Sequence, residues 1–137
     1  MDNSVTKIAI IGLGNIGFRH FQALCKIDKP IDITLIDTEP KQLSLCKKWY
    51  ESVNNSFIKN INFLFSFDSI SDNLDIAIIS TPSTNRRKVV NELLDATQVK
   101  YLILEKILFQ SADDYYFVKS LIDSKKIKAW VNCPRRT

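Results

Sequence analysis

Glycine is scarce in this sequence of 137 residues. It contains only three, Gly12, Gly14 and Gly17, where a domain of average composition has about ten. All three fall within six consecutive residues. Glycine lets the backbone turn sharply and lets other groups approach it closely. The window from Gly12 to Gly17 is therefore the first candidate for a functional loop.

Paired cysteines, metal-binding spacings and long apolar runs are also absent. Cys25, Cys46 and Cys133 are odd in number and far apart, and the chain has no Cys-x-x-Cys pattern. These cysteines predict free thiols in a reducing compartment and no metal site. No apolar run exceeds four residues, against the ~20 that a membrane helix needs. No basic and apolar leader opens the chain, so we expect a cytoplasmic protein without a membrane partner.

Positive charge is in excess, but only near the end of the chain. The net charge is +4, and residues 125–137 contain five basic side chains and no acidic one. The preceding part has 14 basic and 15 acidic residues and is nearly neutral. A nucleic-acid footprint is a basic patch spread over a folded face, so we expect no nucleic-acid partner.

Short apolar runs alternate with helical patterns along the whole chain. Strands are predicted over 5–11, 31–36, 61–65, 75–80, 101–104 and 127–131, and helices over 15–27, 40–52, 86–96 and 111–124, with a turn or short helix over 68–73. This alternation predicts βαβ units and a parallel sheet. Right-handed crossovers allow the doubly wound strand order 3-2-1-4-5-6. We therefore predict one three-layer α/β domain of the Rossmann type over residues 1–137.

The glycine window has the form Gly-x-Gly-x-x-Gly, directly after a strand and at the start of a helix. In this context it predicts a dinucleotide-binding loop whose helix N-terminus receives a pyrophosphate. The alternative is a merely tight turn. The candidate cofactor-binding residues here are Gly12, Leu13, Gly14, Asn15, Ile16 and Gly17.

Asp37 ends the second predicted strand, 20 residues beyond Gly17. At this spacing a carboxylate meets the adenosine ribose of a dinucleotide. Thr38, Glu39 and Pro40 follow, without an arginine to receive a 2′-phosphate. We therefore predict NAD, with NADP less favoured. The alternative is an aspartate that caps the next helix.

Two further segments follow strands at the edge where doubly wound sheets bind ligands. The first is Ser80, Thr81 and Pro82, and the second is Glu105 with Lys106. A lysine next to a cofactor can exchange a proton with a substrate. The alternatives are an ordinary strand-to-helix turn and a solvated strand end.

Two basic features of the helices need separate interpretations. His20, the only histidine, lies on the inward face of the first helix, which favours packing over catalysis. The run from Arg86 to Lys88 opens a helix, where cations oppose the helix dipole unless an anion lies nearby. We therefore hypothesise that Arg86 binds an anionic substrate.

The segments "IAIIGLGNIGFRH", "LIDTEP", "DIAIISTPS", "LILEKIL" and "VNCPRR" together resemble the amino-terminal half of the Gfo/Idh/MocA oxidoreductases. The resemblance implies NAD(P)-dependent hydride transfer at a sugar or cyclitol carbon. It also implies a second, substrate-binding and oligomer-forming domain that this chain lacks. We accordingly expect the full-length form to be a homo-oligomer, and this chain to bind NAD without turnover as a monomer or weak dimer.

By position in that resemblance, Lys106 matches the lysine of a Glu-Lys-Pro motif that contacts the reacting hydroxyl. Glu105 then lies by the nicotinamide, and Thr81 and Pro82 line the cofactor. Arg136, in the Arg135-Arg136 pair, matches an arginine that can reach substrate. The sequence departs from the motif at Ile107, which replaces its proline, and at Arg86, where histidine is common. Other interpretations are a Rossmann methyltransferase, in which Lys106 has no role, and a stand-alone nucleotide sensor.

Overall fold

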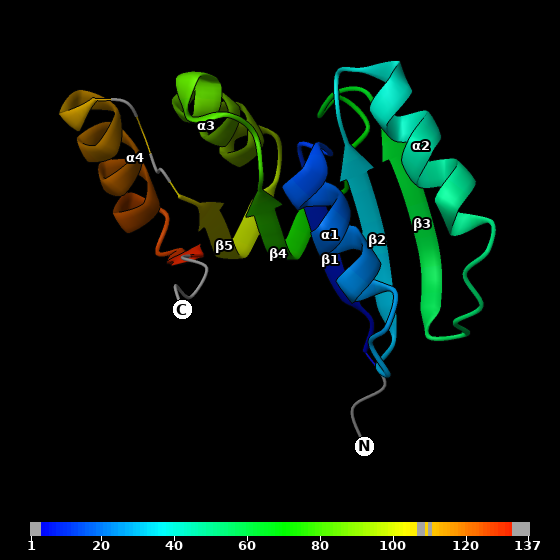
Figure 1. Cartoon of the computed structure of the whole chain (residues 1–137). Helices are drawn as coiled ribbons and strands as arrows, with labels where there is room; N and C mark the ends of the chain where they lie inside the picture. Colours follow the sequence, from blue (N-terminus) through cyan, green and yellow to red (C-terminus); the bar gives the residue numbers. More distant parts are fainter. Residues whose placement is uncertain (1–3, 107–108, 110, 133–137) are drawn as a thin grey trace, which may run out of the picture.

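Six strands and four α-helices alternate along the chain (Figure 1). The computed structural model describes residues 4–106, 109 and 111–132. The strands are β1 (Thr6–Ile11), β2 (Ile31–Ile36), β3 (Ile58–Leu64), β4 (Asn73–Ile79), β5 (Gln98–Glu105) and β6 (Lys128–Asn132). The helices are α1 (Asn15–Leu24), α2 (Pro40–Tyr50), α3 (Arg86–Ala96) and α4 (Ala112–Ser124), with a 3-10 turn η1 (Ser83–Asn85) before α3.

The strands form one parallel sheet in the order β3-β2-β1-β4-β5-β6. This is the doubly wound order expected from the sequence, and the prediction is confirmed. The chain starts in the centre with β1 and reverses direction across the sheet between β1 and β4. Crevices for ligands form at this reversal, outside the carboxyl ends of the strands.

Two apolar clusters cover the two faces of the sheet. One joins β1, β2 and β4 to α1 and α2 around Phe21 and Cys46, both fully buried. The other joins the sheet to α3 and α4 around Val90 and Val118. The central strands are apolar on both faces because helices cover both of them. The predicted three layers are therefore present.

Three strands begin before their predicted bounds, and β4 does so by two residues, at Asn73. β3 begins at Ile58, three residues early, and β5 begins at Gln98. Gln98 and Val99 pair with the first residues of β4, and Lys100 forms an ion pair with Asp75 at 3.5 Å. Polar and apolar residues alternate over Gln98, Val99 and Lys100 because one face of β5 is exposed to solvent at this end of the sheet. The turn or short helix predicted over 68–73 is a turn at residues 68–69, where the Ile70 N–H donates to the Phe67 carbonyl oxygen at 3.1 Å, and Asn73 already belongs to β4.

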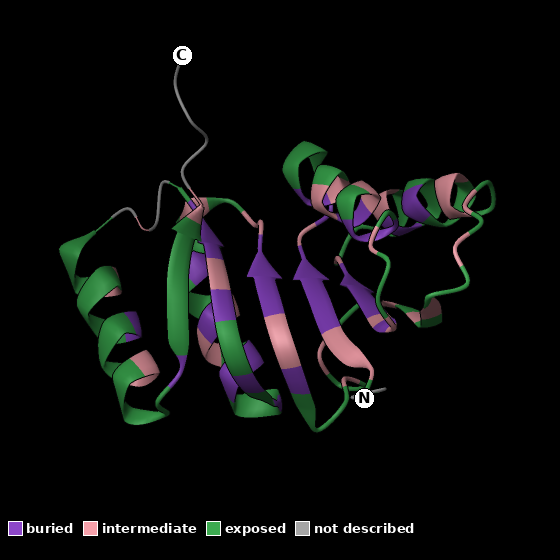
Figure 2. Ribbon diagram, turned by 90° about the horizontal axis from the view of Figure 1, so that it is seen from below, coloured by how far each residue is buried: buried purple, intermediate pink, exposed green. Residues whose placement is uncertain are grey.

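Figure 2 shows that exposure is concentrated at the β6 edge of the sheet. Trp130 is 52% exposed and Val131 is 42% exposed, so this edge presents an apolar face to solvent. Tyr101 packs beside Trp130, with ring centroids 5.6 Å apart. Cys133 lies outside the described residues.

Candidate functional site

Two glycines of the loop lie in close contact with neighbouring backbone atoms. Gly12 has a φ of +93°, and a Cβ there would lie 2.8 Å from the backbone nitrogen of Thr81. A Cβ on Gly17 would lie 1.8 Å from the carbonyl oxygen of Gly12. Only glycine permits these contacts, so Gly17 seats α1 directly on the loop. Gly17 thus packs against the backbone of the loop and allows the close contact between the loop and α1.

The open side of this loop faces a groove. A Cβ on Gly14 would meet no atom within 4 Å, and Gly14 lines the groove together with Asn15 and Ile16. α1 begins at Asn15 without a side-chain cap and without an acidic residue in its first turn. Its first N–H groups and the positive end of its dipole therefore remain available to an anion in the groove.

Asp37 contacts the glycine loop through its carboxylate. Oδ2 accepts a hydrogen bond from the Leu13 N–H at 2.7 Å, and Oδ1 accepts one from the Glu39 N–H at 2.8 Å. Each oxygen has a further lone pair that it can offer to a hydroxyl. Asp37 therefore orders the loop and presents acceptors to the groove at once. The alternative helix-cap role receives no support, because α2 has no side-chain cap.

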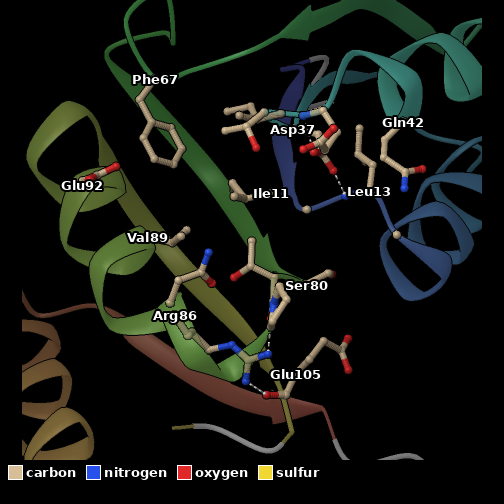
Figure 3. A pocket seen from close by; sticks show the side chains of 18 of the residues that line it. Ile11, Leu13, Asp37, Gln42, Phe67, Ser80, Arg86, Val89, Glu92 and Glu105 are labelled. Atoms are coloured by element: carbon tan, nitrogen blue, oxygen red, sulfur yellow. Dashed lines mark hydrogen bonds between the residues drawn. The ribbon is translucent and has the colours of Figure 1, made fainter. Parts of the chain in front are cut away.

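The groove has a volume of about 1190 Å³ and runs along the carboxyl edge from β2 to β5 (Figure 3). Its lining contains six acidic residues but only two basic ones, Arg86 and Lys106. The acidic residues are Asp37, Glu39, Asp68, Glu92, Asp95 and Glu105. Three of these, Asp37, Glu39 and Asp68, lie in the loops after β2 and β3. An additional phosphate at that end would meet like charge.

Two hydroxyl groups lie at the centre of the groove with no hydrogen bond within the described residues. These are Ser80 Oγ and Thr81 Oγ1, both buried. Both residues line the groove immediately after β4, and Pro82 follows them. A buried hydroxyl without a partner is costly. Rotation about χ1 would bring either hydroxyl to the groove, where a polar ligand would satisfy it.

Arg86 occupies an unusual position for a cation, since it is only 3% exposed at the start of α3. Its guanidinium donates to the backbone carbonyls of Thr81 and Glu105 (Figure 3). It therefore ties the segment after β4 to the end of β5. Burial lowers the pKa of Arg86, and the negative charge of Glu105 opposes that shift. Arg86 borders the groove, and a substrate contact by it stays a prediction.

Glu105 ends β5 and is also buried, at 4% exposure. Its Oε1 accepts a hydrogen bond from His20 Nε2 at 2.5 Å and another from Asn132 Nδ2 at 3.0 Å. His20 lies on α1 and Asn132 on β6, so three elements meet at this carboxylate. Lys106 follows Glu105, is exposed and lines the groove. Glu105 and Lys106, both singled out from the sequence, therefore lie at the groove. The contact between His20 and Glu105 joins residues that are 85 positions apart in the sequence.

The other basic residues singled out from the sequence do not line the groove. Arg87 pairs with Asp114 of α4 at 3.2 Å, and its guanidinium lies over the ring of Phe117. Lys88 approaches Glu92 at 3.9 Å on α3. Arg136, the second candidate substrate residue, and Ile107 lie outside the described residues.

Several residues of the groove were not singled out from the sequence. Phe65 and Phe67 follow β3, and Val89 and Glu92 face them from α3 (Figure 3 labels Phe67, Val89 and Glu92). Only their position in the sequence could have identified Phe65 and Phe67 as groove residues, because the loop after β3 lies at the same edge of the sheet as the loop after β2. Phe65 is 58% exposed, which leaves an aromatic face available to a flat ligand.

A glycine loop on a helix N-terminus, an acid after β2 and two unpartnered hydroxyls after β4 define a dinucleotide-binding α/β domain. A family model described as "Oxidoreductase family, NAD-binding Rossmann fold" matches residues 6–133. The chain belongs to this family, Gfo/Idh/MocA. The cofactor of the family is NAD, and the cradle at Gly14 and the two unpartnered hydroxyls fit a dinucleotide.

Solved structures share this fold. Apo scyllo-inositol dehydrogenase from Lactobacillus casei has a TM-score of 0.74 and 20% identity over 96% of this chain and 37% of that chain. WlbA dehydrogenase from Chromobacterium violaceum, in complex with NADH and UDP-GlcNAcA, has a TM-score of 0.72 and 23% identity over 96% of this chain and 35% of that chain. This chain thus spans little more than a third of their length. At these identities the likeness establishes the fold alone. No curated protein sequence matches the chain.

The described part of the chain contains neither a membrane-spanning helix nor a metal-binding cluster. None of its helices is long and apolar enough to span a membrane. No group of three His, Cys, Asp or Glu side chains there is arranged to hold a metal ion.

Proposed function

We propose that this chain is the NAD-binding half of a dehydrogenase that transfers hydride between a sugar-type or cyclitol-type alcohol and the nicotinamide. The observation that carries the proposal is the groove, in which an open helix N-terminus, the Asp37 carboxylate and two unpartnered hydroxyls meet along one edge. Bound NAD would supply the hydride acceptor. The dehydrogenases of known structure that share this fold act on, or bind, substrates of these kinds.

In this proposal the groove divides into two halves. The first turn of α1 binds the pyrophosphate, and Asp37 accepts hydrogen bonds from the adenosine ribose. The acidic residues beside Asp37 favour NAD over NADP, because they repel a 2′-phosphate. The nicotinamide half then lies over β4 and β5, beside Thr81 and Glu105.

Lys106 is the proposed catalytic residue. It lies next to Glu105 at the end of β5, and its side chain is exposed at the groove. The ammonium form can donate a hydrogen bond to the oxygen of the reacting alcohol, and the neutral amine form can accept the hydroxyl proton as hydride leaves for the nicotinamide. We further propose that the alcohol carries an anionic group. The UDP-GlcNAcA bound in the WlbA structure and the positive charge of Lys106 support this.

We also propose that the chain by itself binds NAD without turnover, as a monomer or weak dimer. Orientation of both reactants contributes about 7–11 kcal/mol to lowering a barrier, and the groove of this chain holds one reactant only. The expected full-length form, a homo-oligomer, would supply the residues that hold the second reactant, the alcohol substrate.

The test is a calorimetric titration of the chain with NAD and NADP, beside an assay at 340 nm with NAD and a panel of sugars and cyclitols. We expect binding of NAD at least tenfold tighter than NADP, which is about 1.4 kcal/mol, and no formation of NADH. Tighter binding of NADP would refute the role of Asp37, and failure to bind either would refute the site. Clear turnover would contradict the need for a second domain.

A further inference from the structure

Glu105 is buried, and its carboxylate takes no part in the proposed contacts to the pyrophosphate and the adenosine ribose. Buried charges are costly unless hydrogen bonds compensate them. Here His20 and Asn132 both donate to Oε1, while Oε2 accepts no hydrogen bond from the described residues. The carboxylate is thus fixed on one side and leaves an oxygen unengaged on the other, and Glu105 lines the groove.

The charges around Glu105 come from three elements. Arg86 of α3 binds the backbone carbonyl of Glu105, and Lys106 follows it in the chain. His20 faces it from α1, and Asn132 of β6 is neutral. With Glu105 ionised, its charge offsets one of the two neighbouring cations. One positive charge therefore remains at this end of the groove with Glu105 ionised, and two would remain with Glu105 neutral.

We propose that Glu105 contacts the nicotinamide half of the cofactor and favours its oxidised, positively charged form, and that His20 and Asn132 are the residues that position this carboxylate. The inference rests on the proposed placement of the dinucleotide. The nicotinamide ring is positive in NAD+ and neutral in NADH, so a nearby anion distinguishes the two forms. The rest of the cofactor is the same in both.

The size of the effect depends on the distance between the Glu105 carboxylate and the nicotinamide ring, for which we take about 7 Å. One unit charge about 7 Å from another, at an effective dielectric of about 40, changes an affinity by about three- to tenfold. Glu105→Gln should therefore weaken the binding of NAD+ by about this factor relative to NADH. ADP-ribose lacks the nicotinamide, so its binding should not change.

His20 provides the test of positioning. His20→Leu removes the donor, and His20→Gln retains one. We expect His20→Leu to lower the preference for NAD+ about threefold, within the electrostatic range above, and His20→Gln to restore most of it. In the double variant of Glu105→Gln with His20→Leu, the preference should equal that of Glu105→Gln alone, because His20 acts through Glu105.

The experiment measures dissociation constants of NADH by its fluorescence, and of NAD+ and ADP-ribose by competition. Glu51→Gln is the matched control, since Glu51 is an exposed glutamate at the end of α2, outside the groove. Thermal unfolding of each variant reports its folded fraction. A selective loss of NAD+ binding supports the proposal.

Other outcomes overturn it in distinguishable ways. Equal weakening of all three ligands would mean that Glu105 has a merely structural role. An unchanged ratio of NAD+ to NADH affinity would refute the charge effect. An additive double variant would refute the positioning role of His20. If the unsubstituted chain bound none of the three ligands, the proposed function itself would fail.

Discussion

Substitution of the glycine loop separates folding from binding. A Cβ on Gly17 would lie 1.8 Å from the Gly12 carbonyl oxygen. Contacts of this kind are essentially never shorter than 3.0 Å, so in Gly17→Ala α1 and the loop must separate by about 1.2 Å. Both atoms belong to the backbone or are fixed to it, so no rotamer change relieves the contact.

The cost follows from two opposing terms. Overpacking costs about 1–3 kcal/mol, and we take the upper end because backbone must move. Replacing glycine by alanine within a helix returns about 1 kcal/mol. The net destabilisation is about 2 kcal/mol, and for a chain of this size Tm should fall by roughly 6–10 °C. Thermal unfolding followed by circular dichroism measures it.

Gly14→Ala is the matched comparison. No atom lies within 4 Å of its Cβ position, so we expect a change in Tm of less than about 2 °C. That methyl group would stand in the groove where the α1 N–H groups face. The affinity for NAD should fall about tenfold or more, the equivalent of one charge-assisted hydrogen bond. An unchanged Tm in Gly17→Ala, or full NAD binding in Gly14→Ala, would refute the reasoning about the loop.

Three further predictions concern residues outside the loop. Arg86→Ala should destabilise the domain by about 3 kcal/mol because it removes a buried, hydrogen-bonded cation. Arg87→Ala, at the exposed neighbour, should cost less than about 1 kcal/mol in urea unfolding. Equal costs would contradict the role of Arg86 in tying the segment after β4 to the end of β5. Burial raises the pKa of the Cys25 and Cys46 thiols from 9.0 to about 11. Unfolding therefore releases protons in this interval, and the free energy of unfolding should fall as pH rises from 9 to 11. Urea titrations at several pH values measure this fall, which should be smaller in a chain with alanine at both positions. Any self-association of the chain in analytical ultracentrifugation should weaken in Trp130→Glu, since Trp130 is 52% exposed; an unchanged dimer would place the contact elsewhere.

The parts of the site that follow from sequence are those set by local pattern. The strand before Gly12 and the helix that begins at Asn15 identify the loop, and the end of β2 places Asp37. The contact between Asp37 and the Leu13 N–H has no such signal, because it depends on the register between β1 and β2.

Long-range contacts explain the remainder. His20 lies on the predicted inward side of α1, but whether it packs or donates depends on β5, 85 residues away. Arg86 was interpreted from the electrostatics of its helix alone, whereas its carbonyl partners follow from how closely β4 and β5 approach each other. Sequence patterns report the period of an element, and they do not report which backbone atoms of another strand it will meet.

The central position of β1 has a consequence for how the protein is made. β1 leaves the ribosome well before its neighbour β4, because the bond from the Lys7 N–H to the Asp75 carboxylate spans 68 residues. At about 5–20 residues per second, β1 waits on the order of several seconds for this partner. Throughout that interval the apolar edge of β1 is unpaired and open to other chains. Nascent chains that pause between β3 and β4 should therefore be the species that depends most on chaperones.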